Sequence, residues 1–357
     1  MADLFSTIAG IGPLDTAAMS AAEARQGMLT KPPQALGRLE SLSIRLAGIT
    51  GTPQPSMARK AVAVMAGDHG VTAEGVSAFP AEVTPQMVLN FLAGGAAINV
   101  LGRHVGARVI VTDVGVASDL SGVEGLRHRK IRPGTANMAA GPAMTHDEAV
   151  RAVEVGIELV EEEVANGLDL IATGDMGIGN TTPSSAIIAA FTGQPVARVT
   201  GRGTGISDAA LKAKVATIEK ALAVNNPDPN DPIDVMAKVG GLEIAALAGV
   251  VLGAAAHRVP VVMDGFISGA AALAATRLCR GAADYILPGH LSVEIGHQVV
   301  FAELGLTPLF DLQMRLGEGT GAALAMFIID GAAKILCEMA TFESAGVSDK
   351  TADVAGV

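Results

Sequence analysis

The chain has 357 residues, of which half are hydrophobic and 17% are charged, and its formal net charge is −11 at pH 7. This length favours one large domain with a smaller one, or two domains of similar size, and the composition excludes a disordered protein. The negative charge argues against a nucleic-acid partner, because binding phosphates requires an excess of Lys and Arg. The longest apolar run, residues 244–256, is too short to span a membrane. With two isolated cysteines and no signal-peptide pattern, a cytoplasmic protein without membrane attachment is expected.

A recurring pattern predicts the fold class. Short runs rich in Val, Ile or Ala end at Gly or Asp clusters and are followed by helical patterns. These runs are residues 61–66, 108–112, 168–172, 259–263, 285–287 and 307–310. They indicate strands buried on both faces, and their alternation with helices predicts an α/β fold with a Rossmann-like, largely parallel sheet flanked by helices. A ligand site is expected at the carboxyl ends of these strands.

Helix signals and the chain ends suggest the domain organisation. Thr84 and Thr182, each followed by proline, are predicted N-caps, and Thr145 with Glu148 makes a capping box. Glu161–Glu163 lie inside the helix that follows and are expected to form a solvated face. Residues 1–50 and 320–357 are predicted to pair into a small discontinuous helical domain, with residues 51–319 forming an α/β domain.

The densest motif lies between a predicted strand and a predicted helix, at residues 174–185. Its glycines let the backbone approach a ligand, and a helix N-terminus attracts anions, so the segment is typical of a phosphate cradle. A tight turn that binds nothing is the alternative. A second glycine loop, residues 201–205, precedes Lys212 and Lys214 and offers positive charge to an anion, although lysines on helices are usually solvated.

Glu318 stands between Gly317 and Gly319 after the last predicted strand. An apolar neighbourhood would raise its pKa and suit it to act as a general base. The alternative is an acidic helix N-terminus stabilised by the helix dipole. The histidines are scattered, and His69, His290 and His297 lack the partners that a zinc site needs, so structural roles are expected for them.

Read in order, many segments closely resemble the nicotinate-nucleotide:dimethylbenzimidazole phosphoribosyltransferase family, which makes the lower-ligand nucleotide of cobalamin. The resemblance spans nearly the whole chain. It is carried by residues 31–40, 66–71, 74–77, 83–88, 94–99, 177–182, 240–244, 264–266, 289–292 and 316–321. Asp175 departs from the family, where glutamate is frequent, and Gln34 stands where glycine is expected.

The resemblance implies transfer of phosphoribose from nicotinate mononucleotide to 5,6-dimethylbenzimidazole, giving α-ribazole 5′-phosphate and nicotinate. It implies a homodimer and no metal or other cofactor. Glu318 is expected to be the catalytic base and Asp175 to stabilise positive charge on the ribose. The expected phosphate and ribose contacts are Gly177, Gly179, Asn180, Thr181, Thr182, Gly203, Lys214, Asp264, Gly265 and Ser292, and the expected base contacts are Ser77, Phe79, Gln86, Met87, Met314 and Leu316. A non-catalytic module that binds nucleotide or azole is the alternative.

Overall fold

The computed structural model describes residues 3–203 and 205–348, and its central feature is a parallel sheet of six strands. The strands lie in the order β3-β2-β1-β4-β5-β6, and every adjacent pair is parallel. They are β1 (Lys60–Gly67), β2 (Ala107–Gly115), β3 (Arg127–His128), β4 (Leu170–Met176), β5 (Val261–Met263) and β6 (Ile286–Pro288). This is the order of doubly wound nucleotide-binding sheets, so the predicted α/β class is confirmed.

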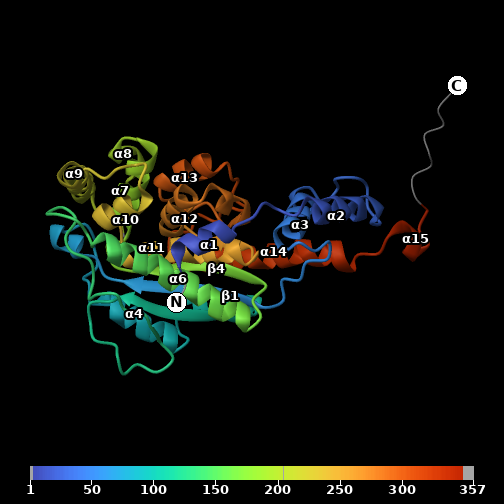
Figure 1. Cartoon of the computed structure of the whole chain (residues 1–357), viewed down its shortest axis with the longest axis horizontal. Helices are drawn as coiled ribbons and strands as arrows, with labels where there is room; N and C mark the ends of the chain where they lie inside the picture. Colours follow the sequence, from blue (N-terminus) through green and yellow to red (C-terminus); the bar gives the residue numbers. More distant parts are fainter. Residues whose placement is uncertain (1–2, 204, 349–357) are drawn as a thin grey trace. The chain divides into compact units, whose positions relative to one another are not determined.

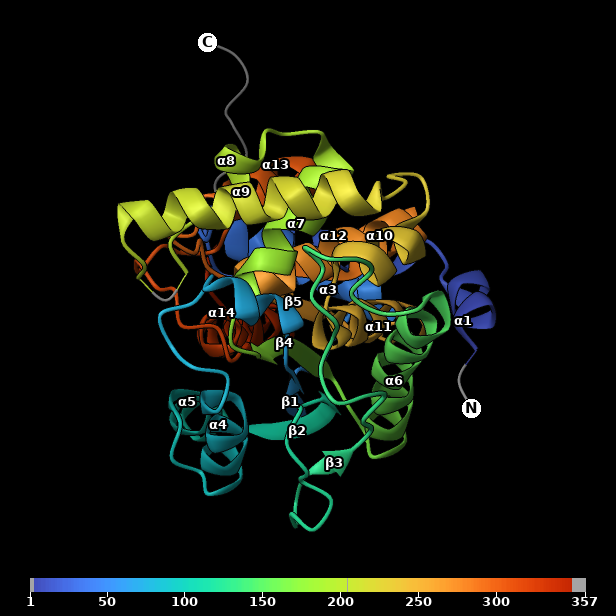
Figure 2. The same cartoon turned by 90° about the vertical axis from the view of Figure 1, so that its left-hand side faces the viewer.

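Helices fill the connections between strands. The α-helices are α1 (Leu4–Gly10), α2 (Thr16–Met28), α3 (Arg38–Thr50), α4 (Val83–Leu92), α5 (Ala97–Val105), α6 (His146–Ala165), α7 (Thr181–Thr192), α8 (Val196–Val199), α9 (Asp208–Asn225), α10 (Pro232–Val239), α11 (Leu242–Ala256), α12 (Phe266–Leu278), α13 (Gly296–Leu304), α14 (Thr320–Glu338) and α15 (Phe342–Ala345). Two 3-10 helices span Gly70–Glu74 and Arg280–Tyr285. In Figures 1 and 2, α4 and α5 lie on one face of the sheet and α6 and α11 on the other. All residues of β1 and β4 are therefore buried.

The strand predictions differ from the structure at two places. Residues 307–310 form no strand, and only Phe310 makes a single parallel bridge, to His290. The short edge strand β3 has no sequence signal, because two residues are too few for a hydrophobic pattern.

Two of the predicted helix starts are wrong. The N-caps of α4 and α7 are Glu82 and Asn180, not Thr84 and Thr182, and neither cap residue makes a side-chain cap bond. The hydroxyl of Thr84 instead accepts the N–H of Ile178, which lies in the turn after β4. A tertiary contact therefore uses the hydroxyl that sequence reasoning assigned to a local cap.

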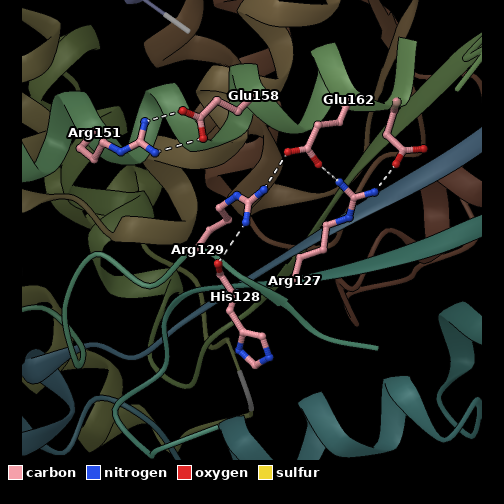
Figure 3. Close-up of polar contacts among 7 residues, drawn as sticks. Arg127, His128, Arg129, Arg151, Glu158 and Glu162 are labelled. Carbon is pink, nitrogen blue, oxygen red and sulfur yellow. Dashed lines mark hydrogen bonds and ion pairs between the residues drawn. The ribbon is translucent and has the colours of Figure 1, made fainter. Parts of the chain in front are cut away.

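The capping box of α6 is confirmed. Of the three glutamates expected to form a solvated face, Glu161 is exposed, but Glu163 is buried. Thr145 Oγ1 accepts the Glu148 N–H at 3.1 Å, and Glu148 accepts the Thr145 N–H at 2.8 Å. Glu163 is fully buried and pairs with Arg127 of β3, and Arg129 Nη2 lies 2.7 Å from Glu162 Oε1. Figure 3 shows both arginines reaching the carboxylates of α6. These ion pairs join the short edge strand to the helix.

The described part of the chain divides into two compact units. One contains the sheet and is formed by the described part of Met1–Gly12 together with Arg59–Met326; the other is formed by Pro13–Ala58 and the described part of Phe327–Val357. The boundaries differ from the predicted 1–50 and 320–357, since α1 groups with the sheet unit, where α6 and α11 contact it. Residues 1–2 and 349–357 of that prediction lie outside the described residues.

The smaller unit has its own apolar core, in which Ala18 and Ala22 of α2 pack with Ala47 of α3 and Leu336 of α14. Arg25 Nη2 donates to the Cys337 carbonyl at 3.0 Å, and Lys31 pairs with Glu40 at 2.8 Å. Gln34 has a φ of 61°, in the left-handed region that favours glycine. This conformation explains why glycine is expected there, and it costs a glutamine roughly 1–2 kcal/mol.

Among the described helices, α14 is long and apolar enough by composition to cross a membrane, with a mean hydropathy of 1.6 over 18 residues. However, 56% of that window is buried inside the structure, as in the core helix of a soluble protein. This feature is therefore weak evidence for a membrane span.

Candidate active site

A pocket of about 560 Å³ lies at the carboxyl edge of the sheet, a volume typical of small-ligand sites. Its lining comes from segments that follow β1, β4, β5 and β6, and from the loop before α14. Eleven predicted residues outside the catalytic pair line it: Ser77, Phe79, Met87, Gly177, Gly179, Asn180, Thr181, Gly203, Gly265, Ser292 and Leu316. The loop before α14 contributes Leu316 and Glu318, and β4 contributes Asp175. The fold thus gathers residues more than 200 positions apart in the chain into one cavity.

The turn between β4 and α7 forms one wall of the pocket. The Asn180 N–H donates to the Gly177 carbonyl at 3.1 Å, and the Thr182 N–H donates to the Gly179 carbonyl at 2.9 Å. Gly179 has a φ of 88°, which only glycine adopts without strain. The N-terminus of α7 follows at Thr181, so the positive end of its dipole lies beside the pocket. The local geometry suits an anionic group.

A buried lysine supports this wall from behind. Lys214 of α9 is 1% exposed, and its Nζ donates to Thr181 Oγ1 at 2.6 Å. Burial lowers the pKa of Lys214 to about 8, opposed by the carboxylate of Glu294. Glu294 is itself buried and lines the pocket, and burial raises its pKa. Lys212, the other lysine considered from sequence, is exposed.

Two buried carboxylic acids face the same pocket. Asp175 is the penultimate residue of β4 and is 5% exposed, and Glu318 is 6% exposed. Burial, together with the negative charges of Asp264, Glu243 and Glu318, raises the pKa of Asp175 to about 8, against a hydrogen bond from Asn180. Burial also raises the pKa of Glu318 to about 7, opposed by the Ile98 N–H and assisted by Asp264. Both acids are therefore poised to exchange a proton near neutral pH.

The backbone around Glu318 is unusual. Gly317, Glu318 and Gly319 have φ values of 81°, 63° and 91°, three left-handed residues in succession. Left-handed geometry costs a non-glycine residue roughly 1–3 kcal/mol, and such strain is concentrated at functional sites. The carbonyl of Glu318 also lies where a side chain at position 174 would be, since a Cβ on Gly174 would stand 2.5 Å from that oxygen. Position 174 of β4 therefore has to be glycine for the turn to pack here.

Part of the pocket lining is apolar and open to solvent. Phe79 and Leu316 line the pocket although 53% and 57% of their surfaces are exposed. Val76, Val83 and Met87 add to this apolar lining. Exposed large apolar side chains beside a cavity are typical of a surface that a flat apolar ligand covers.

Five of the predicted contacts lie outside the pocket lining. These are Thr182, Lys214, Asp264, Gln86 and Met314. Thr182 points into the protein because it lies one residue inside α7, and Asp264 is fully buried. Sequence reasoning missed Ile178, Phe266, His290, Glu294 and Arg315, which line the pocket. His290, Glu294 and Arg315 stand within two residues of predicted contacts, but their side-chain directions depend on the fold.

Within the described residues, no cluster of three or more His, Cys, Asp or Glu side chains could hold a metal ion. His69 Nε2 lies 2.6 Å from Glu243 Oε1, and both side chains are buried. His290 lies 3.9 Å from Asp264, and its ring stacks on Phe310. These histidines are therefore engaged with protein groups.

A parallel α/β unit with an anion-binding turn and two perturbed acids at its carboxyl edge defines an enzyme of phosphorylated substrates. The chain belongs to a phosphoribosyltransferase family, whose sequence profile matches residues 11–347. It is similar to the nicotinate-nucleotide–dimethylbenzimidazole phosphoribosyltransferases of Chloroflexus aggregans and of a Roseiflexus species. The identities are 63% and 62% over 350 residues, covering 98% of this chain and 99% of each relative. The crystal structure of CobT from Thermus thermophilus superposes with a TM-score of 0.90 at 50% identity, covering 94% of this chain and all of that one.

Proposed function

We propose that this chain transfers the phosphoribosyl group of nicotinate mononucleotide to 5,6-dimethylbenzimidazole, releasing nicotinate and forming α-ribazole 5′-phosphate for cobalamin synthesis. The observation that carries this proposal is that one pocket combines a turn suited to an anion, an apolar lining and two acids with raised pKa values. The names of relatives at 62–63% identity support the same reaction.

The substrate phosphate would lie against the turn of residues 177–182 and the Gly203 loop, with Lys214 supplying positive charge through Thr181. Lys214 Nζ is within hydrogen-bond distance of Thr181 Oγ1, so the lysine can polarise this hydroxyl toward an anion. Thr204, which completes the Gly203 loop, lies outside the described residues. Gly265 and Ser292 line the part of the pocket assigned to the ribose.

Glu318 acts as the general base in this proposal. One nitrogen of the benzimidazole attacks the anomeric carbon, and the bond to the pyridinium nitrogen breaks with its electron pair, leaving neutral nicotinate nitrogen. The proton on the other benzimidazole nitrogen passes to the Glu318 carboxylate. A pKa of about 7 suits this step, because the base is partly ionised near neutral pH and still a good proton acceptor.

Asp175 has a less simple role than sequence reasoning suggests. With a pKa of about 8, it is mostly protonated in the empty pocket at neutral pH. The positive pyridinium of a bound nucleotide favours its ionised form, and the carboxylate then stabilises the positive charge that builds on the ribose. One Asp175 oxygen already accepts the Asn180 amide at 2.8 Å, which fixes the orientation of the carboxyl group.

The deciding experiment incubates purified protein with both substrates and follows nicotinate release and α-ribazole phosphate formation by chromatography. Stoichiometric product over many turnovers supports the proposal. Nucleotide binding without nicotinate release would instead identify the non-catalytic binding module, and product with only a different azole would change the acceptor.

We further propose a soluble cytoplasmic homodimer. The support is the family resemblance together with the buried state of most of the α14 apolar window. Light scattering after size-exclusion chromatography in the absence of detergent tests both points, because a monomer or a detergent-dependent species would contradict them.

A further inference from the structure

Asp264 is a buried acid near the pocket, and both of its oxygens accept backbone groups of the Glu318 segment. It follows β5 directly and none of its surface is exposed. Its Oδ2 accepts the Gly319 N–H at 3.2 Å, and its Oδ1 accepts the Ala322 N–H at 2.8 Å. The carboxylate therefore binds the first turn of α14 and the residue before it.

These bonds hold a backbone segment that would not keep its shape alone. The three successive residues 317–319 are left-handed, and a φ of 63° is strained for Glu318 because it carries a side chain. On one side the turn packs against β4, where Gly174 leaves room for the Glu318 carbonyl. On the other side Asp264 binds the N–H of Gly319. The turn is thus fixed between two neighbouring strands of the sheet.

The charges around this segment give Asp264 a second effect. Asp175 and Glu318 face the pocket, and His290 Nε2 lies 3.9 Å from Asp264 Oδ1. Burial raises the pKa of Asp264, opposed by His290 and by the backbone N–H groups that its carboxylate accepts. In its ionised form, Asp264 disfavours ionisation of Glu318 and Asp175. Loss of the Asp264 charge should therefore make Glu318 easier to ionise.

We propose that Asp264 is a positioning residue, which binds the Gly317–Gly319 turn and the start of α14 and so places the Glu318 carboxylate in the pocket, rather than a substrate ligand. The inference rests on the proposed function for its kinetic consequences only. The Glu318 carboxylate has to lie within hydrogen-bond distance of the proton on the acceptor base. A displacement of this carboxylate by about 1 Å can lower the rate on the order of 10²-fold.

The test variant is Asp264→Asn, which keeps the shape but offers only one acceptor oxygen to two N–H donors. The expected result is a kcat about 10- to 100-fold lower with the KM for nicotinate mononucleotide within about twofold of wild type. The acid limb of the kcat profile should also move to lower pH, because the neighbouring negative charge is gone. A merely structural defect would reduce the folded fraction without moving that limb.

Asp113→Asn is a matched control. Asp113 is also buried at the end of a strand, and its Oδ1 accepts the Val116 N–H at 2.8 Å, but it lies outside the pocket lining. Its kcat, KM and pH profile should equal those of wild type. If Asp264→Asn does not fold, Asp264→Ser offers a smaller neutral acceptor in the same space, with the same expected results.

A measurement that does not need turnover distinguishes failure of the positioning role of Asp264 from failure of the proposed function. The carbon-13 carboxyl signal of Glu318, assigned by its absence in Glu318→Gln, should titrate at lower pH in the Asp264 variant than in wild type. If wild-type protein makes no product, the proposed function fails while this titration still tests the inference. A tenfold weaker nucleotide affinity with unchanged kcat would show Asp264 to be a substrate ligand, and an unshifted Glu318 titration with wild-type kcat would overturn the positioning role.

Discussion

Replacing Glu318 with glutamine preserves the volume of the side chain and removes its ability to accept a proton. If Glu318 is the base, kcat should fall about 10²- to 10⁴-fold while both substrates still bind. The pH dependence gives a sharper test, because the pKa of Glu318 is about 7. At pH 5, two units below it, about 1% of this group is ionised, so protonation of Glu318 alone should lower wild-type kcat/KM to roughly one hundredth of its plateau. The glutamine variant should be slow and should lose the Glu318 limb near pH 7, keeping only the limb near pH 8 that ionisation of Asp175 gives.

Steady-state kinetics between pH 5 and 9 measure both effects, and thermal melting of the same samples checks folding. Burial raises the pKa of Glu318 from 4.5 to about 7, so the folded protein holds a proton that the unfolded chain releases between these values. Wild-type stability should therefore fall as pH rises through this window. The stability of Glu318→Gln relative to that of wild type should be higher at pH 8 than at pH 5.

Glu124→Gln is the control, because Glu124 is exposed and outside the pocket lining, and it should match wild type in both assays. Near-normal turnover in a folded Glu318→Gln protein would refute the general-base assignment. It would leave Glu318 as an acid that only interacts with the start of α14.

Three other substitutions test the same geometry. Asp175→Asn should lower kcat more than it weakens nucleotide binding. Because the pKa of Asp175 is raised from 3.8 to about 8, the wild-type unfolding free energy should decline between pH 5 and 7, and the variant should lose about 1.4 kcal/mol per pH unit of that decline. Denaturant unfolding at several pH values contradicts this if the variant keeps the wild-type pH dependence. Lys214→Met should raise the KM for the nucleotide with little change in the KM for the azole. Wild-type nucleotide binding should weaken as pH rises through about 8, where Lys214 loses its charge. Titration calorimetry that shows unchanged nucleotide affinity in the variant would exclude this lysine from the phosphate site. Gly174→Ala should displace the Glu318 carbonyl, which a Cβ would approach to 2.5 Å, and cost about 1–3 kcal/mol of stability together with most of kcat; normal turnover would show that the turn tolerates the shift.

The sequence predicted five of the six described strands, and the ranges 61–66 and 285–287 match β1 and β6 to within one residue at each end. β1 and β4 are buried along their whole length. Residues 307–310 have a similar pattern but form only one bridge, because strand formation there depends on pairing with a neighbour. Local hydroxyl signals failed at Thr84 for the same reason, since its partner is Ile178, far along the chain.

The candidate site shows the same division between local and long-range information. Glycine-rich turns and the acids beside them could be recognised from sequence, because a turn at the end of a buried strand has few chemical solutions. The sequence could not assign Asp264, since its type and position fit a substrate ligand as well as a helix cap. Its two bonds to the Glu318 segment exist only when β5 and α14 lie side by side.

By itself the amino-acid sequence determined the α/β class and the edge of the sheet at which a ligand site was expected, and the family resemblance added the expected roles of Asp175 and Glu318. The first two features follow from hydrophobic periodicity and from residue types next to predicted strands, which are properties of short segments. Only the tertiary structure decided the raised pKa values of the two acids, the strained turn that carries Glu318, and the buried pairing of Glu163 with Arg127. Burial and charge pairing depend on groups brought together from distant parts of the chain, so no local pattern encodes them.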